Sequence, residues 1–151
     1  MKNVSMKLSE HFSLAEMCKT SANLDNVPNE AQVENLKRLC GWLEMLRSEW
    51  NKRYGEGNDP IIINSGFRSE AVNKAVGGVK GSNHLSGCAA DIRVAGIEQL
   101  VRYATILLDI SDESQEDFDE LLLERSPKGN YWLHFAVRPS GNRRKVRLIQ
   151  T

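Results

Sequence analysis

The sequence predicts an α+β fold in which helices flank a small antiparallel sheet. One long stretch carries apolar residues at alternating spacings of three and four, which is one face of a helix. Several short stretches rich in β-branched and aromatic residues, each bounded by turn residues, predict strands. The chain has 151 residues, of which 40% are hydrophobic and 26% charged, so it can bury a core of its own. We therefore expect a single domain over residues 1–151.

Two helices are predicted in the N-terminal third. Residues 11–17 form a short helix in which Ser13 caps the N-terminus and Glu16, three residues later, completes a capping box. A long helix begins near Asn29 and ends before Gly55. Its apolar stripe indicates a core face without a functional role, and consists of Leu36, Leu39, Leu43, Leu46 and Trp50.

The middle of the chain alternates strands and helices. Residues 60–64 are β-branched and predict a buried strand, which leads through the stretch 65–69 into a short helix at 69–75. A second strand is predicted at 90–94. Apolar residues then recur at helical spacing over 97–110, so we expect this helix to pack on the sheet.

The C-terminal part predicts a hairpin and a last strand. Residues 111–117 are acidic and predict a solvated loop. Strands at 118–124 and 130–137 are separated by a turn that contains Gly129, which is a hairpin signal. The last strand is predicted at 145–149, after a turn.

The formal net charge is zero, so the whole molecule has no general attraction to nucleic acid or to an anionic membrane. The basic cluster at 143–145 is more typical of a solvated turn than of a nucleic-acid site. Residues 1–8 contain no apolar run of signal-peptide length, and no stretch approaches the roughly 20 apolar residues of a membrane span. We expect a soluble monomer made in the cytoplasm without a signal peptide.

A candidate zinc site lies between residues 81 and 93. His84 and Asp91 are both residue types that bind Zn²⁺, and a catalytic zinc usually has three protein ligands with one position left for water. His134, in a predicted strand, is better placed as the third ligand than His11, which lies far upstream. The alternative is that the loop histidine is a polar surface residue and the aspartate caps or pairs locally.

The full pattern S-x-H-x-x-G-x-A-x-D is more demanding than two single residues. It comprises Ser82, His84, Gly87, Ala89 and Asp91. Here the sequence resembles the zinc D-Ala-D-Ala carboxypeptidase family, metallopeptidase family fifteen, in its phage and bacterial type. Members share a fold with hedgehog signalling domains. The resemblance implies that a zinc ion is bound by His84, Asp91 and His134.

Two further stretches of the chain carry the same resemblance. Residues 12–16 (Phe-Ser-Leu-Ala-Glu) and 25–28 (Asp-Asn-Val-Pro), followed by a Leu-rich helix, are typical of the family. The family also has an S-G-[YF]-R-S element, which is Ser-Gly-Phe-Arg-Ser here. It implies that Arg68 binds substrate or stabilises developing negative charge. An arginine that only braces the loop is the alternative. We also expect Ser82 to contact the substrate.

Three cysteines cannot all pair within one chain, and none forms a C-x-x-C pair, so free thiols are expected at Cys18, Cys40 and Cys88. Cys88 lies within the proposed metal loop and is an alternative zinc ligand. The family pattern, however, has a variable position there.

The hairpin suggests the catalytic base. If it folds symmetrically about Gly129, Glu124 lies directly opposite His134, on the same face of the sheet. A carboxylate there can take a proton from the attacking water and deliver it to the leaving amine. Some family members have their catalytic acid three residues before the second histidine, where this chain has Tyr131. Glu120 is therefore kept as a second candidate.

The expected function is hydrolysis of peptidoglycan stem peptides by a zinc metallopeptidase. The resemblance leaves open whether a terminal D-Ala is removed or an internal L-Ala-D-Glu bond is cut. A phage endolysin that is released to the cell wall at lysis fits the lack of an export signal. A zinc-stabilised binding module without activity is the alternative. No H-E-x-x-H motif occurs, which excludes a zincin.

Overall fold

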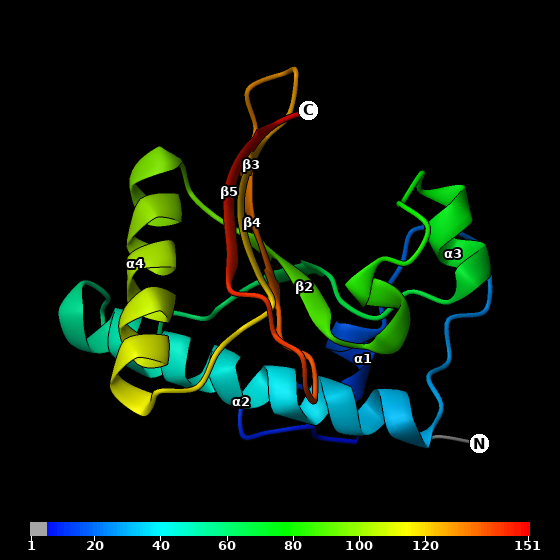
Figure 1. Ribbon diagram of the computed structural model, residues 1–151, viewed down its shortest axis with the longest axis horizontal. Coiled ribbons are helices and arrows are strands. Elements are labelled where there is room, and N and C mark those ends of the chain that lie inside the picture. Colours follow the sequence, from blue (N-terminus) through cyan, green and yellow to red (C-terminus); the bar gives the residue numbers. More distant parts are fainter. Residues whose placement is uncertain (1–5) are drawn as a thin grey trace.

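The computed structural model describes residues 6–151. Residues 1–5, on which the expectation of no signal peptide partly rests, lie outside the described part. Along the described chain the elements follow the order α1, α2, β1, α3, η1, β2, α4, β3, β4 and β5, where η1 is a 3₁₀ helix (Figure 1). None of the described helices is long and apolar enough to cross a membrane.

The two N-terminal helices form where the sequence predicts them. Helix α1 spans Leu14–Met17, and Ser13 and Glu16 make the reciprocal bonds of a capping box. Helix α2 spans Glu30–Arg53 and begins at a second capping box, in which Asn29 pairs with Gln32. The predicted apolar stripe of α2 is buried. Both helix predictions are therefore confirmed.

Five strands form one sheet in the order β1-β2-β4-β3-β5. Their bounds are Ile63–Ser65 (β1), Ala89–Arg93 (β2), Glu120–Arg125 (β3), Tyr131–Ala136 (β4) and Lys145–Gln150 (β5). The fold is α+β, as expected.

The sheet is mixed rather than antiparallel, because β5 runs parallel to β3. The connection of residues 137–144 passes the beginning of β3, where Lys145 N donates to the carbonyl of Asp119 and Lys145 pairs with Glu120. Strand β5 therefore starts beside the start of β3 and must run in the same direction. The expectation of a purely antiparallel sheet is wrong at this edge.

Three further helical segments follow α1 and α2 in the chain. Helix α3 spans Glu70–Ala75, helix α4 spans Ile97–Ser114, and η1 spans Asn83–Ser86. Residues 111–114 of the predicted acidic loop belong to α4 instead. Ser111 is buried, and its hydroxyl donates to the carbonyl of Glu116, just beyond the helix. The 3₁₀ helix was not predicted.

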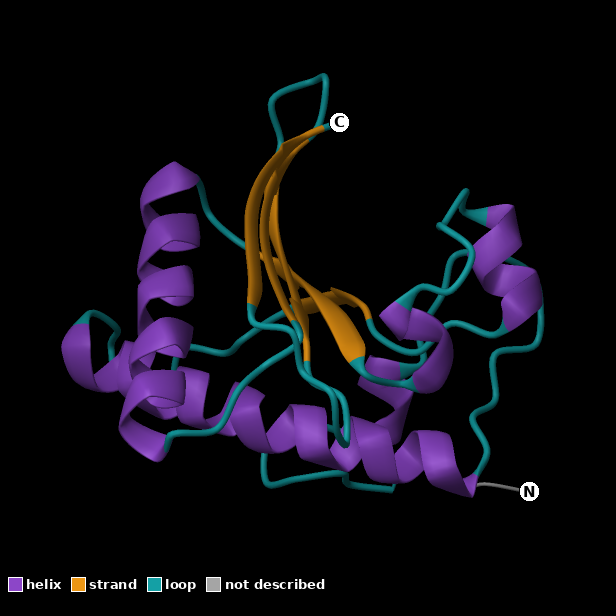
Figure 2. Cartoon of the chain, in the orientation of Figure 1, coloured by secondary structure: helices purple, strands orange, loops and turns teal. Residues whose placement is uncertain are grey.

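The two faces of the sheet have different neighbours. Helices α2 and α4 cover one face, whereas α3 and η1 lie beyond the other (Figures 1 and 2). Leu121, Leu133 and Phe135 point into the hydrophobic core, and alternation along β4 places Trp132 and His134 on the opposite face. The polar residues of β2, β3 and β4 therefore gather on the face that is turned away from the core.

Candidate metal centre

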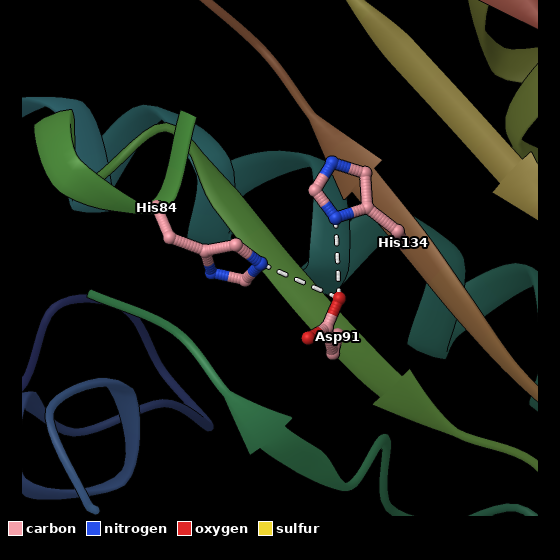
Figure 3. Close-up of side chains that lie close together, drawn as sticks. All are labelled: His84, Asp91 and His134. Atoms are coloured by element: carbon pink, nitrogen blue, oxygen red, sulfur yellow. Dashed lines mark hydrogen bonds and ion pairs between the residues drawn. The ribbon is translucent and has the colours of Figure 1, made fainter. Parts of the chain in front are cut away.

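Two of the three predicted ligands are brought together by strand pairing. Asp91 on β2 lies directly opposite His134 on β4. His84 comes from η1, just before β2. One ligand atom from each of these three residues lies within 4.8 Å of the others (Figure 3). Oδ1 of Asp91 is 3.4 Å from Nε2 of His84 and 3.1 Å from Nδ1 of His134. The structure therefore brings all three predicted ligands into one cluster.

The hydrogen bonds of His84 fix which nitrogen can bind a metal. Its Nδ1 lies 2.6 Å from the carbonyl oxygen of Gly66, which can only accept, so Nδ1 carries the proton. Nε2 is left with its lone pair. It is buried and has no hydrogen-bond partner among residues 6–151, although Asp91 is close. A buried, unpaired imidazole nitrogen beside a carboxylate is satisfied when both bind one cation. The donor set thus fits zinc.

The pattern residues around His84 shape its loop. The hydroxyl of Ser82 accepts a hydrogen bond from the backbone N of His84, at 3.1 Å. Gly87 ends η1 with φ +77°, and a Cβ there would lie 2.6 Å from the carbonyl oxygen of Gln32. Glycine is needed for both reasons. Contact between Ser82 and the substrate stays a prediction.

His134 is held between two carboxylates. Its Nδ1 faces Asp91, and its Nε2 lies 3.0 Å from Oε1 of Glu120. Burial alone would lower the pKa of His134, but the hydrogen bonds with Asp91 and Glu120 raise it to about 9. Burial would raise the pKa of Asp91, yet the hydrogen bond with His134 and the nearby imidazole of His84 keep the pKa well below its usual range. Metal binding must therefore displace a proton from His134.

Arg68 contacts the candidate ligand Asp91. Its Nη2 lies 3.2 Å from Oδ2, the oxygen that does not face the two histidines. The other nitrogens bond to Ser65 Oγ at 3.0 Å and Asn73 Oδ1 at 3.3 Å. The guanidinium therefore orients the carboxylate and leaves Oδ1 directed at the cluster. The bracing contact is thus present, and a substrate role for Arg68 stays a prediction.

The predicted hairpin register is wrong. Leu122 lies opposite His134, and Glu124 lies opposite Trp132. The turn is centred on residue 128, because Gly129 supplies the left-handed residue at the end of the turn, with φ +85°, and not its middle. The shift amounts to two residues, so Glu124 keeps the predicted face of the sheet but not the position beside His134.

Glu120 and Glu124 thus share one face but have different surroundings. The carboxylate of Glu120 contacts His134 and accepts a second hydrogen bond from Asn83, at 2.7 Å. The hydrogen bond with His134 lowers the pKa of Glu120 to about 2. Glu124 makes no ion pair within the described part of the chain, and burial raises its pKa. Which of them acts as the base stays a prediction.

The cluster lies in a cleft of about 730 Å³ between the sheet and the segment that joins α3 to η1. Both glutamates, Ser82 and Arg68 line it. Sequence reasoning missed other cleft residues, namely Asn83, Arg138 and Arg143. Asn83 occupies a variable position of the pattern and gave no signal. Arg143 fell in a cluster interpreted as a solvated turn, and its pairing with buried Asp119 appears only in three dimensions.

The cysteines do not belong to the metal cluster. Cys18, Cys40 and Cys88 are free, as expected. Cys88 is buried beside β2, but the group of described residues that could hold a metal does not include it. The alternative of a thiolate ligand therefore has no support.

Comparison with known proteins points to one family. A family model described as Peptidase M15 matches residues 10–111, which include His84 and Asp91 but end before His134. A zinc D-Ala-D-Ala carboxypeptidase from Streptomyces albus G is 48% identical over 40 residues. The aligned part is 26% of this chain and 16% of the length of that relative.

Proposed function

We propose that this chain, which belongs to the peptidase M15 family, is a zinc peptidase that hydrolyses peptidoglycan stem peptides. His84, Asp91 and His134 would hold the metal. The observation that carries this proposal is the buried Nε2 of His84, which lacks a hydrogen bond among the described residues and converges with two other donor atoms. Zinc, when bound, supplies a Lewis acid for the scissile carbonyl and lowers the pKa of water.

The residues around the metal site divide the remaining tasks. Glu120 holds the ring of His134 through Nε2, which is how a carboxylate commonly orients a metal-bound histidine. Arg68 holds Asp91 through Oδ2. Once Asp91 binds the metal, the guanidinium can also attract a substrate carboxylate or an oxyanion, because it lies at the wall of the cleft.

Glu124 is the proposed base. Its carboxylate lines the cleft, and burial raises its pKa, which makes it a stronger base than an exposed glutamate. Glu120 is a weaker base, since its charged form is stabilised by His134 and Asn83. Glu124 would take a proton from the attacking water and deliver it to the leaving amine.

The substrate class is inferred from the relative. That enzyme is named for D-Ala-D-Ala, so we propose that this chain cuts a bond next to a D-amino acid. Removal of a terminal D-Ala and cleavage of an internal L-Ala-D-Glu bond are the two forms of the proposal. Action on the cell wall after release at phage lysis is part of it.

Mass spectrometry of defined stem peptides after incubation with zinc-loaded protein tests the activity. We expect cleavage by the wild type, and loss of both zinc and cleavage in His84→Ala and His134→Ala. His11→Ala is the matched control, because His11 pairs with Glu44 away from the cluster. A wild type that holds zinc but cleaves no stem peptide would overturn the peptidase proposal and favour a binding module. Retention of zinc by His134→Ala would overturn the ligand set.

A further inference from the structure

We propose that Arg138 and Arg143 form a binding subsite for a free carboxylate of the substrate peptide. This inference rests on the proposed function, because it concerns the same cleft. Both arginines line the cleft, and both follow β4 in the chain. Nothing in the catalytic scheme above requires either of them.

A buried carboxylate positions the two guanidinium groups. Asp119 is fully buried, and Arg143 bonds to it through Nε at 3.0 Å and Nη2 at 2.8 Å. Nε of Arg138 lies 3.2 Å from Asp119 and donates to Asn83 Oδ1 at 2.9 Å. These bonds hold both side chains in one orientation, so little conformational entropy is lost when a ligand binds.

These hydrogen bonds leave some terminal nitrogens of Arg138 and Arg143 available as donors to a ligand. Within residues 6–151, Nη1 and Nη2 of Arg138 and Nη1 of Arg143 make no hydrogen bond. The side chains are 35% and 47% exposed. A guanidinium that uses only its Nε can still offer both terminal nitrogens to a carboxylate as a bidentate pair.

The charge of Asp119 does not by itself require two arginines. Arg143 alone binds both oxygens of Asp119, which also accept from the backbone N of Arg143 and from Asn83. Arg138 is therefore not needed to satisfy this carboxylate. Its charge lies at the wall of the cleft, where an anionic group of a ligand can reach it.

The subsite lies on the Glu120 side of the metal centre. Asn83 precedes His84 in the chain and donates to both Asp119 and Glu120, at 2.8 and 2.7 Å. Arg68, by contrast, is attached through Asp91. The cleft therefore presents arginines at two places, with Arg68 beside the candidate ligand Asp91 and Arg143 near Glu120, which contacts His134. A peptide that carries two carboxylates could be held on both sides of its scissile bond.

Matched peptides test the subsite. One stem pentapeptide carries both its C-terminal and its internal glutamate carboxylate, and two others have one or the other converted to an amide. Dissociation constants are measured calorimetrically with zinc-loaded protein, and KM from initial rates replaces them where a peptide is cleaved. We expect Arg138→Gln to weaken binding of the diacid about tenfold or more, since a charge-assisted hydrogen bond is lost.

One of the two amidated peptides lacks the carboxylate that the subsite binds. This peptide should bind to wild type and to Arg138→Gln with equal affinity. This comparison identifies which carboxylate occupies the subsite. Arg143→Lys serves as a second variant, because it keeps a positive charge near Asp119 but loses the planar fork; thermal unfolding confirms that each variant folds. Arg102→Gln, on the exposed side of α4, is the matched control.

Equal binding of the diacid by Arg138→Gln and wild type would overturn the subsite. So would an equal loss for the diacid and both amides. A protein that cleaves no peptide but binds the diacid through Arg138 would contradict the proposed function and leave the subsite standing. If the peptide is cleaved and neither arginine variant changes its KM, the subsite is overturned and the proposed function stands.

Discussion

Glu120 on β3 reaches diagonally to His134 on the neighbouring strand β4, and its Oε1 lies 3.0 Å from Nε2 of the imidazole. The residue directly opposite Glu120 is Ala136, whose small side chain leaves room for this contact. A carboxylate in this position fixes the orientation and tautomer of a metal-bound histidine. We therefore expect Glu120 to act as a positioning residue for His134.

Glu120→Ala should lower the affinity for zinc about 10–100-fold, because His134 loses the carboxylate that orients its ring. Glu124→Ala is the matched control on the same strand and face, and its zinc affinity should stay close to that of the wild type. Competition titration with a chelating dye measures both. Equal zinc affinity in Glu120→Ala and wild type would show that the hydrogen bond has no such role.

Glu124→Gln should retain zinc but lose hydrolysis, since an amide keeps the size of the side chain and cannot accept the proton from water. The expected loss of kcat is about 10²–10⁴-fold, typical for removal of general acid-base catalysis. Peptide cleavage and zinc content are measured on the same preparations. A variant that cleaves at the wild-type rate would exclude Glu124 as the base and leave Glu120 as the candidate.

Arg68→Ala should affect both metal and substrate. Asp91 loses the bond to Oδ2, so we expect zinc affinity to fall by about tenfold. KM should rise as well if the guanidinium binds a substrate carboxylate. Arg68→Lys keeps the charge but cannot reach Ser65, Asn73 and Asp91 together. A variant with unchanged KM at saturating zinc would limit Arg68 to the bracing of Asp91.

Asp119 should make stability depend on pH in acid. Burial alone would raise its pKa, but bonds from Arg143 and Asn83 lower it from 3.8 to about 2. A group with a lowered folded-state pKa stabilises the fold above its unfolded pKa, and this contribution is lost as the pH falls from about 4 through 2.

Urea unfolding between pH 2 and 7 measures this effect. Asp119→Asn should be less stable at pH 7 by about 1–3 kcal/mol, because a charged acceptor of several hydrogen bonds is removed. The difference from the wild type should shrink as the pH approaches 2. A difference that is the same at every pH would contradict the proposed linkage.

Local sequence patterns were sufficient for most of the fold and for the identity of the proposed ligands. The capping box at Ser13 depends on residues within one helical turn, and the apolar stripe of α2 repeats from one turn to the next, so spacing alone indicates both. The pattern around His84 and Asp91 is also local. Its glycine is required by a positive φ at residue 87, which the backbone of η1 imposes.

Only the tertiary structure decided the hairpin register, the direction of β5 and the partners of the cleft residues. The left-handed Gly129 at the end of the turn moved Glu124 away from His134 and brought Glu120 to it. The contacts of Asp119 with Arg138 and Arg143 join residues 19 or more positions apart. Such contacts depend on how strands pair and on how side chains reach from one strand to another. The spacing of residues along a single strand or helix indicates neither the pairing nor the reach.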